Sequence, residues 1–233
     1  MTKEQFISDV ELQVYQGQIS DDAELSKDQI AFWGSYNLNM VVANELNEKL
    51  KRGEFFPPVY KKRASCEVLT KEDIDCGDDC QDRVFAQLDE EILSLNKDAG
   101  VMRVTTDEGD IVLKASVETL DLLRYMPFAK PTTDNLVYVR EGKKIFIEGL
   151  KSVDIPFNEI NVDYIPKQNL LTMANTDEVL VSDMALPQVI DLTVQRAKLE
   201  LYGTQPDKEN DGVDYKQTAY HTAIANPANS EPQ

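Results

Sequence analysis

The fold class of this chain is decided by Met102-Arg-Val-Thr-Thr-Asp-Glu-Gly-Asp-Ile-Val-Leu-Lys114. Two short runs rich in β-branched residues flank Asp107-Glu108-Gly109, and a glycine turn between such runs predicts a β-hairpin. The stretch from Leu136 to Glu148 has the same pattern around a second glycine. Hairpins this short and local favour an antiparallel sheet over a nucleotide-binding fold, in which strands and helices alternate.

The flanks of the two hairpins continue the β pattern. Period-two alternation predicts further strands at Tyr60–Leu69, Arg83–Leu88 and Asn161–Ile165. A short helix is expected over Val117–Tyr125, where Pro127 ends it because proline lacks the backbone donor. The middle of the chain is therefore predicted to be β-rich.

Two capping boxes predict where the N-terminal helices begin. Thr2 is followed three residues later by Gln5, and Ser26 is followed in the same way by Gln29. Apolar residues then recur at helical spacing, and glycine follows each run. The helices expected from these signals cover residues 3–16 and 27–52.

The end of the chain combines one compact helix with a polar segment. A helix is expected over Met184–Tyr202, with Pro187 in its first turn, where a missing N–H is tolerated, and Gly203 at its end. Residues 204–233 contain little aliphatic material and are expected to form an extended or disordered tail.

Together these elements predict an α+β fold. An N-terminal helical hairpin and the C-terminal helix are expected to form a helical layer, beside an antiparallel β-rich middle and an extended C-terminal tail. The expected divisions are residues 1–58 for the N-terminal helices, 59–183 for the β-rich middle, 184–203 for the C-terminal helix packing with the N-terminal helices, and 204–233 for the tail.

The chain is strongly acidic, with 42 Asp and Glu against 24 Lys and Arg, and a formal net charge of −18 over 233 residues. A surface this acidic does not hold a phosphate backbone by releasing counterions. It suits a soluble surface, or a passage through which DNA slides without sticking. The absence of eighteen consecutive apolar residues predicts no membrane span, and the amphipathic N-terminus predicts no secretory signal.

One acidic segment contains the candidate metal ligands Asp73, Asp75, Cys76 and Cys80. The two aspartates match the start of a calcium loop, but the acid that should close the loop is replaced by Val84. The two cysteines could bind zinc or form a disulfide, although no histidine lies near them. An exposed acidic loop without a ligand is the third alternative, and no cofactor is expected.

Catalysis is not expected, and the chain is predicted not to be an enzyme. The single histidine, His221, lies in the predicted tail, where no packing would position a general base. Nucleophile motifs and glycine-rich phosphate loops are absent from the sequence. Lys61-Lys62-Arg63 is the one basic triplet. On a strand Lys61 and Arg63 would share one face, which suits a solvated edge or a contact with an acidic neighbouring subunit.

The last helix and the residues after it resemble a known family. Asp183-Met-Ala-Leu-Pro-Gln-Val-Ile-Asp-Leu-Thr-Val-Gln-Arg-Ala197 and Leu201-Tyr-Gly-Thr-Gln-Pro-Asp-Lys-Glu-Asn-Asp-Gly212 are similar to the C-terminal part of structural proteins of tailed phages that infect Bacteroidetes. The ring proteins of the head-to-tail connector in crAss-like podoviruses are the most similar. This resemblance implies a portal-binding homo-oligomeric ring, often a dodecamer, in the virion at the head-to-tail junction, made in the host bacterial cytoplasm. It transfers no catalytic residue.

The resemblance therefore implies a virion structural protein whose ring joins portal to tail and gives an acidic channel, through which genome DNA passes without specific binding. The expected partners are copies of itself, the portal protein and other connector or tail proteins, with no membrane. The alternatives are a tail or capsid surface module that binds a ligand or host glycan, and a hydrolase built on paired carboxylates. Apolar positions of the two longer helices are the candidates for the subunit interface: Trp33, Met40, Val41, Ile190, Val194, Ala197 and Leu201.

Overall fold

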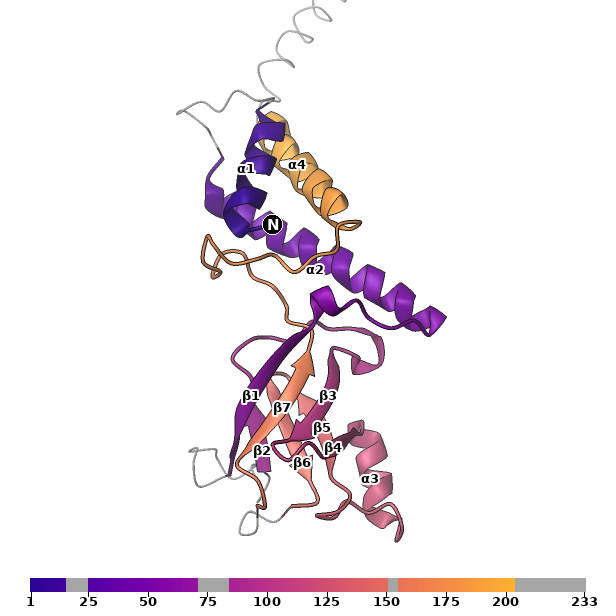
Figure 1. Ribbon diagram of the computed structural model, residues 1–233. Coiled ribbons are helices and arrows are strands. Elements are labelled where there is room, and N and C mark those ends of the chain that lie inside the picture. Colours follow the sequence, from indigo (N-terminus) through magenta and orange to yellow (C-terminus); the bar gives the residue numbers. More distant parts are fainter. Residues whose placement is uncertain (16–24, 71–83, 151–154, 204–233) are drawn as a thin grey trace, which may run out of the picture. The chain divides into compact units, whose positions relative to one another are not determined.

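The fold is α+β, and the computed structural model describes residues 1–15, 25–70, 84–150 and 155–203 (Figure 1). The helices are α1 (Lys3–Val14), α2 (Lys27–Arg52), α3 (Val117–Tyr125) and α4 (Leu186–Gly203). The strands are β1 (Lys62–Leu69), β2 (Val84–Gln87), β3 (Val101–Thr106), β4 (Ile111–Lys114), β5 (Val137–Glu141), β6 (Lys144–Glu148) and β7 (Glu159–Tyr164).

These elements belong to two compact units. Unit 1 consists of Met1–Asn37, Leu170–Asp177 and the chain from Gln188, and unit 2 consists of Leu38–Asn169 and Glu178–Pro187. The first part of α2 belongs to unit 1 and the rest of that helix belongs to unit 2. The expected tail, residues 204–233, lies outside the described residues. Among those that are described, no helix is long and apolar enough to cross a membrane.

Both capping boxes are confirmed. Thr2 Oγ1 accepts a hydrogen bond from the N–H of Gln5 at 3.3 Å, and Gln5 Oε1 accepts one from the N–H of Thr2 at 3.0 Å. Ser26 and Gln29 make the same pair of bonds, at 3.2 and 3.0 Å. Each pair satisfies two donors that would otherwise be unpaired at a helix start. Both helices therefore begin where the sequence predicts.

The core of unit 1 depends on a close approach between α1 and α2. Phe6 of α1 is fully buried, and a Cβ at Gly34 of α2 would lie 2.6 Å from its ring. Helix α4 is joined to α2 by a buried hydrogen bond, in which Asn37 Nδ2 donates to Thr193 Oγ1 at 3.1 Å. A glycine in a helix interior disfavours the helix by about 1 kcal/mol relative to alanine. Here it creates the space that the ring of Phe6 occupies.

Gly34→Ala is therefore expected to destabilise the protein although alanine is the better helix former. Overpacking a core costs about 1–3 kcal/mol, which exceeds the propensity gain. We expect a net loss of about 1–2 kcal/mol in the free energy of unfolding, measured by urea titration. In a Phe6→Leu background, where the aromatic ring is absent, Gly34→Ala should lower the free energy of unfolding by a smaller amount. An alanine variant as stable as the wild type would contradict this packing.

The seven strands of unit 2 form a closed barrel in the order β1-β2-β6-β5-β4-β3-β7. Both predicted hairpins are confirmed, since β3 pairs with β4 and β5 pairs with β6, each antiparallel. The prediction of a purely antiparallel sheet is wrong at one place, because β4 and β5 run parallel. Residues 115–136, which include α3, supply the long crossover that a parallel pair needs.

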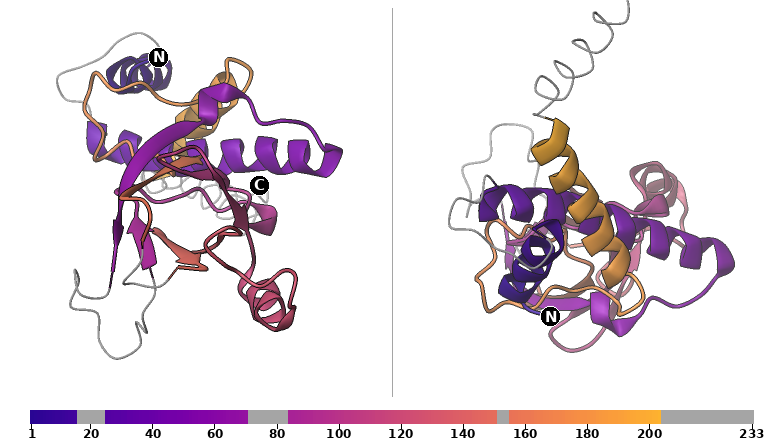
Figure 2. Two further views of the ribbon diagram at one scale, coloured as in Figure 1. Left: turned by 60° about the horizontal axis from the view of Figure 1, so that its bottom comes forward. Right: turned by 90° about the horizontal axis from the view of Figure 1, so that it is seen from above.

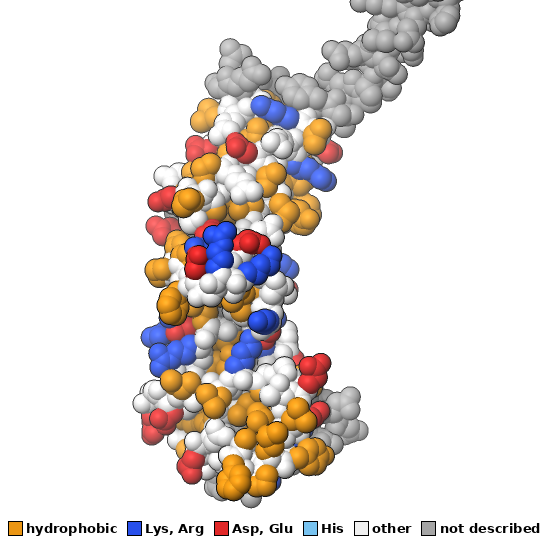
Figure 3. All heavy atoms as spheres, turned by 90° about the vertical axis from the view of Figure 1, so that its right-hand side faces the viewer, with side chains coloured by type: hydrophobic (Ala, Val, Ile, Leu, Met, Phe, Trp, Pro, Cys, Tyr) orange, Lys and Arg blue, Asp and Glu red, His pale blue; other side chains and the backbone are white. Residues whose placement is uncertain are grey.

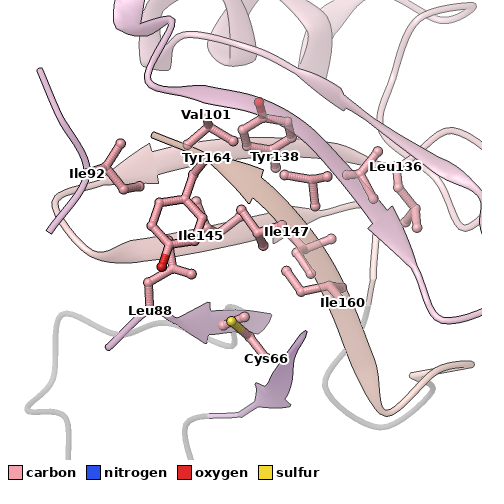
Figure 4. Packing of buried hydrophobic residues seen from close by; sticks show 14 of the residues in the cluster. Cys66, Leu88, Ile92, Val101, Leu136, Tyr138, Ile145, Ile147, Ile160 and Tyr164 are labelled. Carbon is pink, nitrogen blue, oxygen red and sulfur yellow. The ribbon is translucent and has the colours of Figure 1, made fainter. Parts of the chain in front are cut away.

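The interior of the barrel is filled by alternate residues of its strands (Figure 4). In β7, Ile160, Val162 and Tyr164 lie inside and are at most 2% exposed. Cys66 of β1 also points into this core, where it is a free thiol whose pKa is raised by burial. The period-two burial leaves the other set of strand residues on the outer surface of the barrel.

Candidate interaction surfaces

The outer surface of unit 2 has an apolar patch over β4 and α3. Figure 3 shows hydrophobic side chains gathered over this part of the molecule. In β4, Val112 points into the barrel while its neighbours on either side point outward. This apolar patch consists of Ile111 (60% exposed), Leu113 (53%), Val117 (56%), Leu122 (61%), Tyr125 (88%) and Phe128 (103%).

Helix α3 presents this patch because its other side is already packed. Ser116 caps the helix, since its Oγ accepts the N–H of Thr119 at 3.1 Å. Leu120 and Leu123 then pack against outward-facing residues of the barrel wall. Together they form a small cluster with Ala115, Val137 and Val139. Figure 2 shows α3 lying on the outside of the barrel. The remaining side of this nine-residue helix faces solvent.

The two basic side chains beside the apolar patch, Arg124 and Lys114, are paired within the chain. Arg124 lies 3.4 Å from Asp121 and 2.9 Å from Glu148, measured between side-chain nitrogen and oxygen. Lys114 Nζ lies 3.6 Å from the carboxylate of Asp98. The apolar patch therefore has no strong net charge of its own.

A second outer surface, on β1, β7 and β3, is polar and contains a buried carboxylate. Asp163, 3% exposed, lies 2.9 Å from Lys61 Nζ and 2.7 Å from Arg63 Nε. Its register partner on β3 is Arg103. The hydrogen bond from Arg63, helped by that from Lys61, lowers the pKa of Asp163 below its ordinary value. The expectation that Lys61 and Arg63 share a face is confirmed, and Lys62 pairs instead with Glu90 at 2.6 Å.

Asp163→Asn is expected to lower the free energy of unfolding by about 1–2 kcal/mol at pH 7, because it leaves Lys61 and Arg63 facing each other. A carboxyl with a lowered pKa in the folded state stabilises above its unfolded value of 3.8, and this contribution is lost as the pH falls through the folded pKa. The difference in the free energy of unfolding between wild type and variant should therefore become smaller below pH 3.8.

Thermal unfolding across pH 2–7 measures this difference. Glu91→Gln is the matched control, because Glu91 and Lys167 form an ion pair in which both side chains are more than half exposed. The control should change little at any pH. An Asp163→Asn penalty that stays constant down to pH 2 would show that the pKa of Asp163 is not lowered in the folded protein.

The interface candidates chosen from the sequence differ in exposure. Met40 is 36% exposed, and Trp33 and Leu201 are half-buried. The other four are buried in the single chain, so they are core residues of their own units rather than surface: Val41 (4%), Ile190 (8%), Val194 (7%) and Ala197 (0%). On α2 within unit 1 the more exposed apolar residues are Phe32 (59%) and Tyr36 (68%), one helical turn apart.

The candidate metal ligands Asp73, Asp75, Cys76 and Cys80 lie outside the described residues, as does His221. Within the described ranges, no group of three or more His, Cys, Asp or Glu side chains is placed to hold a metal ion. Among the described residues, the candidates for recognition are the apolar patch, the polar face around Asp163 and the exposed apolar residues of α2.

The apolar patch was missed by sequence reasoning, although a signal for it was present. The segment from Val117 to Phe128 is apolar on more than one side of a helix that is too short to be buried all round. When such a helix packs on a sheet with one apolar side, its other apolar side stays exposed to solvent.

Two comparisons with known proteins bear on this chain. The model of the family CrAss_Ring_2, described as phage tail ring protein 2, matches residues 5–214. This match covers both units and most of the chain. The comparison with curated proteins gives no significant match.

Proposed function

Because the chain belongs to the phage tail ring protein 2 family, we propose that it is a ring-forming subunit of a phage head-to-tail connector, which joins the portal to the tail. Family membership indicates a virion structural protein rather than an enzyme. The match over residues 5–214 is the observation that carries the proposal. The proposed partners are copies of itself, as in a dodecamer, together with the portal protein and other connector or tail proteins.

The acidic charge supports a role in DNA passage. With a formal net charge of −18, the protein repels the phosphate backbone instead of binding it. A ring of such subunits would surround an acidic channel, through which the genome passes without being held. In this proposal DNA is cargo and not a specific ligand.

The ring contact is heterologous in this proposal, because a ring closed by rotation needs two different surfaces on each subunit. Of the residues predicted for this contact, Trp33, Met40 and Leu201 are not fully buried in the single chain. These three remain the proposed interface residues. Phe32 and Tyr36 extend the exposed apolar surface of α2 within unit 1.

Mass photometry of the full chain over a range of concentrations, with negative-stain imaging of any large species, tests the proposal. We expect closed rings, because a heterologous contact repeated by rotation forms a ring when the rotation closes. The resemblance to connector ring proteins implies about a dozen subunits in each ring. A surface-binding module would instead form a stable free oligomer with exposed aromatic side chains. Mixing in the portal protein should produce a joint complex, and a chain that stays monomeric both alone and with portal protein would refute the connector role.

A further inference from the structure

We propose that the apolar patch is the docking surface for a second copy of this chain. The proposal rests on the ring proposed above and deepens it, because it names one side of the contact between neighbouring subunits. It assigns this role to β4 and α3 of unit 2, in addition to the helical positions that the sequence suggested.

The exposed apolar area is larger than a monomer ordinarily shows. Tyr125 is 88% exposed and Phe128 is as exposed as in an isolated peptide. Aromatic side chains bury about 150–250 Å² each, so these two alone offer about 300–500 Å². The largest patch on a typical monomer is about 300–600 Å² in total. With four aliphatic residues, each more than half exposed, the area approaches the roughly 800 Å² per partner of a specific interface.

Folding of the single chain does not account for these residues. The packed side of α3 is supplied by Leu120 and Leu123, which contact the wall of the barrel. The barrel interior is filled without any member of the apolar patch. These side chains therefore contribute little to the stability of the subunit, and their exposure costs solubility unless another surface covers them.

The charge of the patch favours a second copy as the occupant. Residues 111–128 contain two basic residues, Lys114 and Arg124, and two acidic residues, Glu118 and Asp121, so the segment is formally neutral in a chain of net charge −18. Arg124 pairs with Asp121 and Glu148, and Lys114 pairs with Asp98. Neither basic residue of this segment is therefore free to attract an acidic ligand. Two copies of an acidic chain repel each other over most of their surface. A neutral apolar patch lets them approach without that repulsion.

The variant that tests this docking is Tyr125→Glu combined with Phe128→Glu. Both side chains are almost fully exposed, so the change should leave folding intact. The matched control is Phe55→Glu combined with Met184→Glu, because these residues are 96% and 92% exposed, belong to the same unit, and lie outside the apolar patch. Both variants add the same charge, which separates loss of the patch from general repulsion.

We expect the patch variant to stay monomeric at concentrations at least tenfold above those at which the wild type and the control assemble. Tyr125→Ser combined with Phe128→Ser removes the aromatic rings without adding charge and should also weaken assembly. Mass photometry gives the oligomeric state, and circular dichroism with thermal unfolding verifies that every variant is folded.

The outcomes separate the docking surface from the connector role. A patch variant that forms rings like the wild type overturns the docking proposal and leaves the ring in place. Wild-type dimers that never close into rings, but are lost in the patch variant, support the docking and overturn the ring. A wild type that is monomeric at every concentration overturns the proposal that a second copy occupies the patch.

Discussion

Val194→Asp is expected to lower the free energy of unfolding by about 3–5 kcal/mol, because it places an unpaired charge in the core of unit 1. Val194 is 7% exposed, and Ala197, one turn further along α4, is fully buried. An isolated carboxylate cannot be moved from water into such a site without several kcal/mol of desolvation. A domain of this kind is stable by about 5–15 kcal/mol, so much of its stability would be lost.

Urea unfolding followed by circular dichroism measures this effect. Leu199→Asp is the matched control, because Leu199 lies on the same helix and is 70% exposed. The control should change the free energy of unfolding by about 0.5 kcal/mol or less. If Val194→Asp instead unfolded like the wild type and failed only to assemble, the stripe from Ile190 to Leu201 would lie between subunits, as the sequence first suggested.

Gly100→Ala is expected to destabilise the barrel by about 3 kcal/mol, although it adds a single methyl group. A Cβ at Gly100 would lie 2.3 Å from the carbonyl oxygen of Leu93 and 2.7 Å from Ile92 Cγ2. The clash is with backbone that is itself fixed, since Leu93 N–H donates to the carbonyl of Ile165 and Ile165 N–H donates to that of Gly100, both at 2.9 Å. The methyl group therefore displaces two hydrogen bonds at once.

Gly53→Ala provides the contrast for this variant. Gly53 has a φ of +71° and no atom within 4 Å of an added Cβ, so its substitution tests backbone strain without a clash. That strain costs about 1–2 kcal/mol. Thermal unfolding of both variants should show a larger loss for Gly100→Ala. An equal or smaller loss there would mean that the loop before β3 yields easily.

Local signals were enough to predict most elements of this fold. The capping residues Thr2 and Ser26 located two helix starts, and the turns at Gly109 and Gly142 located two hairpins. Both kinds of signal depend on residues a few positions apart, which a sequence displays directly. Closure of the barrel depends on pairings between distant strands, and no local pattern encodes those.

Which apolar side chains are exposed was harder to predict than the fold. Ile190, Val194 and Ala197 form an apolar stripe in the sequence, but a stripe does not tell whether its own chain or a neighbour covers it. The structure buries these three residues in the single chain and leaves Tyr125 and Phe128 exposed. Solvent exposure, which distinguishes the two cases, emerges only when the whole unit is assembled.

The position of β7 has a consequence for the order in which the protein is made. β7 lies between β1 and β3 in the barrel, and its Asp163 is paired with Arg63, 100 residues earlier in the chain. During translation both β1 and β3 are therefore synthesised before the strand that joins them, and each presents an open edge until β7 leaves the ribosome. Open edges invite pairing with other chains. Where many nascent copies are made close together, the interval before β7 emerges is when this chain is most exposed to aggregation.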